Sequence, residues 1–307
     1  MGLRARLAAL ADKNDVVYSF FTTPAAWFSA AVLVVLVAAA LLAPWLSSVN
    51  PFDLGSLDVT DAHLPPAWTE EGDARFWLGT DDQGRDLLSA ILYGLRLSLS
   101  ISLVSVVLSI VIGVGLGVTA GFAGGWIDTV LMRVCDVMLS FPAILVALLA
   151  DGILRSAFPG AAHESVAYFV LIFAITLSGW VPYARTVRGL TLVEKGKEFV
   201  MAAELIGEKK LTVMRRHILP NVLGPVFVLA AVNVATAVMT EATLSFLGVG
   251  VPPTTPSLGT LIRIGNDYLF SGEWWICIFP GIVLIAVVLA VNLLGDWLRD
   301  AVNPGLQ

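Results

Sequence analysis

Long apolar stretches with few or no charges dominate the chain and predict helices that cross a membrane. We place six of them at about residues 26–46, 97–120, 127–150, 165–184, 222–245 and 275–296. Each is long enough for an α-helix to cross the hydrocarbon layer, which takes roughly 18 apolar residues or more. Lipid offers the backbone no hydrogen-bond partner, so each span must be helical. The pattern therefore predicts an all-α polytopic membrane protein with six transmembrane helices.

Composition agrees with this class. The 307 residues are 57% hydrophobic and only 14% charged, with a mean hydropathy of +0.85, whereas a soluble domain carries about 25% charge. Cys135 and Cys277 both fall in apolar stretches, and no Cys/His cluster has the spacing of a metal site. We therefore expect neither a disulfide framework nor a bound metal.

The distribution of basic residues predicts the orientation. Arg4, Arg6 and Lys13 precede the first apolar run, which is too long for the hydrophobic region of a signal peptide. Most Lys and Arg residues fall on the side of the two termini, and basic loops stay in the cytoplasm. We therefore expect a cytoplasmic interfacial segment over residues 1–25 and a transmembrane domain over residues 26–303, with both termini in the cytoplasm. Residues 47–92 would form an external loop and residues 185–221 a cytoplasmic loop.

The external loop is acidic and contains Pro51, Pro65 and Pro66, which argue against long regular structure. It could be a platform for an external partner or solute. It could equally be a solvated loop that is acidic because of the topology alone.

A ladder of glycines runs along the second span. Gly113, Gly117 and Gly121 are each four residues apart, so they form one smooth stripe on a helix. Another helix can approach such a stripe closely. The stripe is either a packing contact or a contact that moves during function.

Few polar groups fall within the spans. Arg133 and Asp136 are three residues apart and can pair on one helix face. Asn233, Thr240 and Glu241 cluster toward the end of the fifth span. Because charge is costly in lipid, these five residues are candidates for a polar pathway. The alternatives are pairing between helices or, for Glu241, a position at the outer interface.

The segment between spans four and five is the most distinctive part of the chain. It holds a concentration of basic residues: Arg185, Arg188, Lys195, Lys197, Lys209, Lys210, Arg215 and Arg216. Within it, Phe199, Ala202, Ala203 and Ile206 follow the spacing of one helix face, and Gly207 stands where a left-handed turn would end that helix.

A second short helix, with Leu211, Met214 and Ile218 apolar, should follow, and Pro220 should open span five. The apolar face of this bent helix pair is too small to be a core. It would fill a groove on another protein, or it would lie on acidic lipid.

The same segment resembles the EAA loop of bacterial ABC importer permeases, whose pattern is E-A-A-x3-G-x9-I-x-L-P. Ala202, Ala203 and Gly207 match it in register, as do Leu219 and Pro220. The chain departs from it at Met201, where the family has Glu, and at His217, where the family has Ile. The resemblance implies that this loop docks on an ATPase. The residues implied in that coupling are Glu198, Phe199, Ala202, Ala203, Ile206, Gly207, Leu219 and Pro220.

Further motifs resemble the dipeptide/oligopeptide/nickel permeases, and in particular their second permease subunit. The external signature reads L-G-T-D-x-x-G-R-D over residues 78–86 and includes Gly79, Asp81, Gly84, Arg85 and Asp86. Residues 121–142 and 242–253 also resemble that family. The signature residues would shape the external side, as a structural turn with a local ion pair or as a solute contact.

The resemblance implies an ABC type I importer fold with a cytoplasmic coupling-helix loop. It also implies partners: a homologous permease subunit, two cytoplasmic ATPase subunits and a periplasmic solute-binding protein, in the bacterial inner membrane. The chain has no G-x-x-x-x-G-K-[ST] loop, so ATP and Mg would be held by the ATPase subunits and this chain would be no enzyme. Transport would proceed by alternating access.

Di- and oligopeptides are the solutes that the resemblance favours, while nickel, glutathione and other peptide-like solutes stay open. Two other classes of membrane protein would each carry a sequence cue of their own. A membrane-embedded enzyme would need a catalytic motif such as H-E-x-x-H or G-x-S-x-G, and neither is present. A single-chain secondary carrier would favour inverted repeats, and no clear repeat is visible.

Overall fold

The computed structural model describes residues 15–302, apart from 48, 49, 52, 54, 56 and 158–162. Residues 1–14 of the predicted interfacial segment therefore lie outside the described residues. One isolated bridge joins Thr80 and Asp86, and the regular structure of the described part is otherwise helical. Five of its helices are long and apolar enough to cross a membrane, or six spans if the bent pair α6–α7 counts as one.

The longer helices cover all six predicted stretches. Their bounds are α2 Asp15–Thr22, α3 Pro24–Leu41, α4 Ala43–Leu46, α5 Leu87–Ala123, α6 Gly125–Ser140, α7 Ala143–Ala157, α8 His163–Lys195, α9 Glu198–Leu205, α10 Lys210–Val213, α11 Leu219–Phe246, α12 Leu258–Tyr268 and α13 Trp275–Val302. Short turns of other helix types are η2 Val59–Asp61, η3 Met214–Ile218 and η4 Leu269–Ser271.

The third predicted span, 127–150, is not one continuous helix. It is divided into α6 and α7, which meet at a bend of 90°. Phe141 at the break is extended, with φ −99° and ψ 123°. The ring of Pro142 disfavours the helical conformation of the residue before it and removes one backbone donor. The proline therefore accounts for the break, which the apolar pattern alone did not predict.

Two helices are longer than predicted. α5 has 37 residues, or about 55 Å, and includes residues 87–92 of the predicted external loop. The Asp86 side chain caps its first turn by accepting a hydrogen bond from Ser89 N over 3.0 Å. α8 continues past Pro182 to Lys195, so the first part of the predicted cytoplasmic loop 185–221 is helical rather than loop. The basic composition of this part therefore does not prevent it from continuing the helix.

The predicted glycine stripe is where α5 and α8 pack. A Cβ added at Gly113 would lie 2.5 Å from Trp180 O, and one at Gly117 would lie 2.6 Å from Ala184 O. A Cβ at Gly121 would come within 2.7 Å of Thr191 Cβ. Real Cβ atoms do not approach backbone that closely, so this helix contact requires glycine. The expected close approach of a second helix is thus confirmed, and α8 is that helix.

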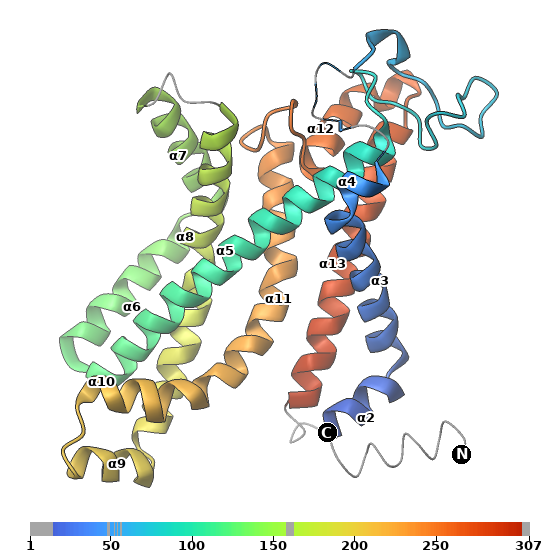
Figure 1. Cartoon of the computed structure of the whole chain (residues 1–307). Helices are drawn as coiled ribbons and strands as arrows, with labels where there is room; N and C mark the ends of the chain where they lie inside the picture. The colour runs from blue at the N-terminus through green and yellow to red at the C-terminus, as the bar shows by residue number, and fades with distance from the viewer. Residues whose placement is uncertain are drawn as a thin grey trace, which may run out of the picture.

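The two ends of the molecule carry different structures (Figure 1). At one end α9 and α10 lie below the long helices, and α2 lies near the same end beside α13. Trp297 Nε1 donates to Ser19 Oγ over 3.3 Å and so ties α13 to α2. The loop between α4 and α5 lies at the opposite end, together with α12. α5 runs between the two ends and contributes to the main apolar clusters.

Candidate functional site

The docking segment, which we define as residues 196–221, begins with a short helix and a tight turn. Gly207 follows α9 with φ +83°, a conformation that glycine adopts without steric cost. Glu208 N donates to Ala203 O and Gly207 N donates to Glu204 O, each over 3.1 Å. These two bonds form a Schellman motif, which ends a helix and satisfies its last carbonyls. The structure thus places the predicted left-handed turn at Gly207.

The rest of the docking segment differs from the prediction. A separate second helix is not formed: α10, η3 and α11 run on as one helix from Lys210 to Phe246. η3 is a π-helical turn in which Leu219 N donates to Met214 O, five residues earlier. Pro220 lacks the donor that an α-helix would use at this point, so the bond pattern widens locally.

One apolar face of the docking segment packs inward. Val200 and Ala203 from α9 are buried with Val213 and Ile218, in a cluster that also includes Val222. Ala203 was expected on the docking face, and this is wrong, because its side chain is enclosed by its own chain. Leu219 packs partly against the same cluster. These contacts hold α9 firmly against the ends of the long helices.

A second apolar face of the segment points outward. Leu205 is 87% exposed and Ile206 is 78% exposed. Three further large apolar side chains of the segment, Phe199, Met201 and Leu211, are exposed as well. Glu198, Ala202 and Pro220 also lie on the exposed surface. Leu205 and Met201 were missed by the sequence reasoning, although their apolar character within a short helix was a signal.

Polar contacts lie where the docking segment meets the long helices and within the segment itself. Lys195 Nζ at the end of α8 donates to Phe122 O at the end of α5 over 2.7 Å. Lys197 Nζ pairs with Glu194 Oε1 over 2.6 Å. His217 Nε2 lies 3.1 Å from Glu208 Oε2. The histidine that departs from the family pattern therefore takes a local polar partner across the Gly207 turn.

The signature residues at the opposite end form a buried turn. Gly79 and Gly84 have φ of +85° and +74°, and a Cβ at Gly84 would lie 2.3 Å from Asp58 O. Asp81 Oδ1 accepts hydrogen bonds from the backbone N of Arg85 over 3.0 Å, and Oδ2 accepts from Arg85 Nε over 2.6 Å. The structure thus gives the signature the geometry of the structural turn with a local ion pair.

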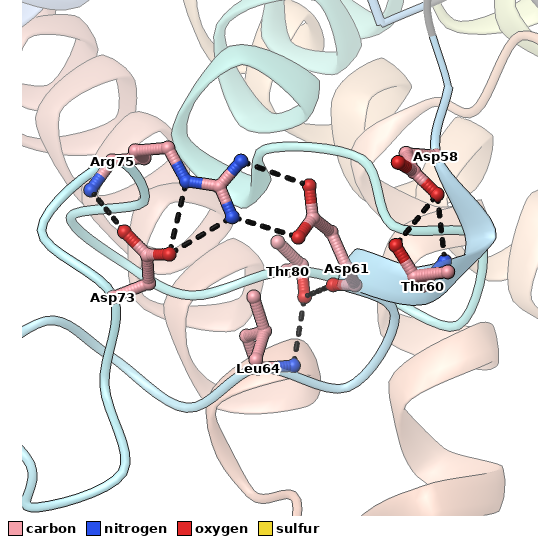
Figure 2. A network of polar contacts seen from close by, with 7 residues as sticks. All are labelled: Asp58, Thr60, Asp61, Leu64, Asp73, Arg75 and Thr80. Carbon is pink, nitrogen blue, oxygen red and sulfur yellow. Dashed lines mark hydrogen bonds and ion pairs between the residues drawn. The ribbon is translucent and has the colours of Figure 1, made fainter.

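An exposed network lies beside this turn (Figure 2). Arg75 pairs with Asp61 over 2.8 Å and with Asp73 over 2.9 Å. Hydrogen bonds from Arg75 hold the pKa of Asp73 below its usual range, and hydrogen bonds from Thr60 do the same for the pKa of Asp58. Thr80 Oγ1 donates to Asp61 O over 2.6 Å. The network orders the acidic loop but supplies no catalytic group.

Asp82 behaves differently from its neighbours. It is half-buried next to Asp81 and Arg85, and its Oδ1 atom has no hydrogen-bond partner among the described residues. Burial, and then the negative charge of Asp81, raise the pKa of Asp82. Burial disfavours the charged form of a carboxyl group, as does a like charge nearby.

Ionic contacts link α6 to α8. Arg188 Nε and Nη2 contact the two carboxylate oxygens of Asp128 over 2.5 and 2.6 Å. Asp136 Oδ1 contacts Arg185 Nη2 over 2.5 Å, whereas Arg133 is 3.8 Å from its other oxygen. The predicted Arg133–Asp136 pair is therefore the weaker contact of Asp136, and Arg185 on the neighbouring helix is the nearer partner.

The remaining polar candidates are inside or beside the bundle. Glu241 is fully buried, and Ser245 Oγ donates to it over 2.7 Å. Thr240 Oγ1 donates to Thr236 O within α11 over 2.8 Å. Asn233 lies at the edge of a cavity of about 210 Å³ between α5, α8 and α11. Glu241 does not line that cavity.

Known proteins resemble this chain over most of its length. Residues 113–307 match the model of the "binding-protein-dependent transport system inner membrane component" family, and residues 14–66 match the "N-terminal TM domain of oligopeptide transport permease C". The dipeptide transport system permease protein DppC of Escherichia coli is 40% identical over 90% of this chain and 87% of its own. The di/tripeptide transport system permease protein DppC of Pseudomonas aeruginosa is 38% identical over 90% and 86%.

The fold agrees with these relatives. A chain of the MetNI methionine ABC transporter, solved in inward-facing conformations, superposes with a TM-score of 0.55 and 19% identity, over 69% of this chain and 96% of that one. Fold and apolar helices define a multi-pass membrane protein with the fold of an ABC importer permease. The chain belongs to the family of binding-protein-dependent transport system inner membrane components. Membership implies that it works with ATPase subunits and a solute-binding protein.

Proposed function

We propose that this chain is a transmembrane permease subunit of an ATP-driven importer for di- and oligopeptides. The observation that carries the proposal is the docking segment, which is anchored by one apolar face and exposes another. Relatives named as dipeptide permeases support the choice of solute. The segment itself holds no nucleotide-binding loop, so ATP and Mg would bind to two partner ATPase subunits.

The proposed arrangement follows from the docking segment. It would lie in the cytoplasm with both termini, and the loop between α4 and α5 would face a periplasmic solute-binding protein across the inner membrane. A homologous permease subunit would complete the translocation path as a heterodimer. Leu205, Ile206 and Phe199 would seat in the ATPase, with Glu198 and Ala202 beside them and Gly207 setting the bend.

The contacts of the segment suggest how ATP would drive transport. The π-turn continues the segment into α11, the Lys197–Glu194 ion pair ties it to the end of α8, and Val200 packs in one cluster with Phe122 at the end of α5. Closure of the ATPases would therefore move these three helices together. To shift the helices from one packing to another, ATP must favour the second packing by a few kcal/mol.

Cross-linking tests the docking. A variant with Leu205→Cys on a Cys135→Ala, Cys277→Ala background should form a cross-link to the ATPase in the assembled complex. The matched control is Val59→Cys, an exposed apolar position in the loop between α4 and α5, which should form none. Capture of phospholipid alone at residue 205 would contradict the docking role.

Uptake tests the solute. Proteoliposomes that contain the permease pair, the ATPases and the binding protein should accumulate L-alanyl-L-alanine in the presence of ATP. The binding protein should be saturated with the peptide. Absence of ATP-dependent accumulation would overturn the peptide assignment while leaving the family and the docking test intact.

A further inference from the structure

The cavity between α5, α8 and α11 is uncharged but polar. Its volume is about 210 Å³, and the side chains that line it include Ser109, Ser178, Tyr183, Asn233 and Thr236. Among the residues that the structure describes, no Asp, Glu, Lys, Arg or His lines it. Thr236 is exposed and Asn233 is half-buried, whereas Tyr183 is fully buried. The cavity therefore opens beside α11 and closes against α8.

Two hydrogen-bonding groups in this cavity face each other and have no other partner. The Tyr183 hydroxyl lies against the Asn233 side chain, and neither that hydroxyl nor Asn233 Nδ2 makes a hydrogen bond of standard geometry with any described group. Buried polar groups are nearly always satisfied in folded proteins, so such groups need an explanation. Both can donate to a carbonyl oxygen that enters the cavity.

An acceptor lies on the same wall. Pro182 is inside α8 and lines the cavity. Its ring nitrogen carries no hydrogen, so it cannot donate to the carbonyl of Ser178, four residues earlier. Ser178 lines the cavity as well. The Ser178 carbonyl thus lacks its usual helical donor and is available to an N–H group.

The wall that carries these groups is held in place by close packing. Gly113 of α5 lies so near α8 that an added Cβ would be 2.5 Å from Tyr183 Cβ. A Cβ added at Gly179 of α8 would lie 2.7 Å from Ser109 Oγ. Two glycines therefore fix α5 against α8 on either side of Tyr183. A site with a fixed wall loses little entropy when it is filled.

We propose that this cavity is a subsite for one peptide unit of the translocated solute. The donors on Tyr183 and Asn233 match a peptide carbonyl, and the Ser178 carbonyl matches a peptide N–H. Ligand pockets for whole small molecules measure roughly 300–1,000 Å³, so this cavity fits part of a solute. The absence of charge in its lining favours the neutral amide over the charged ends of a peptide. The inference rests on the proposed peptide transport.

Selective removal of the acceptor tests the subsite. Pro182→Ala supplies an N–H to the Ser178 carbonyl and so occupies it, while helix formation improves. We compare ATP-dependent uptake of L-alanyl-L-alanine with uptake of its analogue methylated at the peptide nitrogen. Pro182→Ala should reduce the preference for the unmethylated peptide by about tenfold relative to wild type, the effect of one lost hydrogen bond. Pro225→Ala, a proline inside α11 outside the cavity, should retain the wild-type preference.

Removal of the donors should have a different signature. Tyr183→Phe and Asn233→Leu should each lower uptake of both peptides by a similar factor, because both peptides keep the carbonyl. Thr243→Val is a control on the exposed side of α11 and should match wild type. The binding protein is the same in every assay, so its own selectivity cancels from the comparison.

The results distinguish failure of the proposed subsite from failure of the proposed peptide transport. If wild type takes up the dipeptide but Pro182→Ala keeps its full preference, the subsite is overturned. Equal uptake by wild type and both donor variants would overturn it as well. If wild type takes up no dipeptide, the proposed peptide transport has failed instead. Should Asn233→Leu fail to assemble, Pro182→Ala and Tyr183→Phe still decide.

Discussion

Arg85 Nε donates to Asp81 Oδ2 over 2.6 Å, and both side chains are shielded almost completely from solvent. Arg85 Nη1 also donates to Pro253 O over 2.6 Å. The arginine therefore joins the turn before α5 to the loop before α12, two segments far apart in the sequence. The ion pair is buried, so removal of either partner would leave the other as a buried charge without a counter-ion.

Arg85→Met should destabilise the protein by about 3–5 kcal/mol, because it leaves the Asp81 carboxylate buried and uncompensated. Thermal unfolding of the purified protein in detergent measures the loss. Arg75→Met is the control, since Arg75 makes comparable ion pairs while 60% exposed. Solvent screens those pairs, so their loss should matter far less. If the two variants lost the same stability, burial would not determine how strongly these ion pairs stabilise the protein.

Asp82 should make stability fall as the pH rises. Its pKa is raised by burial, so the folded state holds the proton more tightly than the unfolded chain does. The group favours folding below its ordinary pKa of about 3.9, and this contribution is lost as the pH rises through the raised pKa. Asp82→Asn should therefore melt above wild type at pH 7, with the difference shrinking toward pH 3.

Asp73→Asn provides the opposite sign as a control. The pKa of Asp73 is lowered by Arg75, so its contribution is present above the ordinary pKa and is lost as the pH falls through the lowered one. This variant should melt below wild type at pH 7. An Asp82→Asn variant that also melts below wild type at pH 7 would contradict the conclusion that the folded state disfavours the charged form of Asp82.

The contact of α5 with α8 should tolerate no added carbon at Gly117. Gly117→Ala places a Cβ 2.6 Å from Ala184 O, and overpacking of this kind typically costs about 1–3 kcal/mol. Gly115→Ala, in the same helix, has nothing within 4 Å and should gain up to about 1 kcal/mol from the higher helix propensity of alanine. Melting temperatures of the two variants should move in opposite directions, and a parallel shift would argue against the close contact.

Gly207→Val should weaken coupling between peptide and ATP hydrolysis. A Cβ added at Gly207 would meet no atom within 4 Å, so the cost arises from the φ of +83°, which β-branched residues avoid. The expected result is lower peptide-stimulated ATPase activity in a complex that still assembles. Gly224→Ala in α11, which also has open space around it but no positive φ, should couple normally. Unchanged coupling in Gly207→Val would count against the role of the turn.

The sequence predicted those features that depend on local pattern. Apolar length placed the spans, and the four-residue spacing of Gly113, Gly117 and Gly121 predicted a close helix contact. Gly207 marked the end of α9. Each of these signals depends on the residue type itself and on nearby positions, without reference to distant parts of the chain.

Features that depend on tertiary packing were not predictable. α9 is apolar on two faces, and the sequence alone could not show that Val200 and Ala203 pack inward while Leu205 and Ile206 face out. Tyr183 was missed because the burial of its hydroxyl against Asn233 of α11 appears only when neighbouring helices are in place. Pro182 within an apolar span was a visible signal for that region, as Pro142 was for the break between α6 and α7.

The length of α5 has a mechanical consequence. The helix starts at the cap formed by Asp86, next to the buried Arg85, and ends near the Phe122 carbonyl held by Lys195. One continuous helix therefore joins the outer loop to the docking segment, whose Val200 and Val213 pack in one cluster with Phe122. We expect a displacement of either end of α5 to be transmitted to the other end through the helix itself, without a chain of side-chain contacts in between.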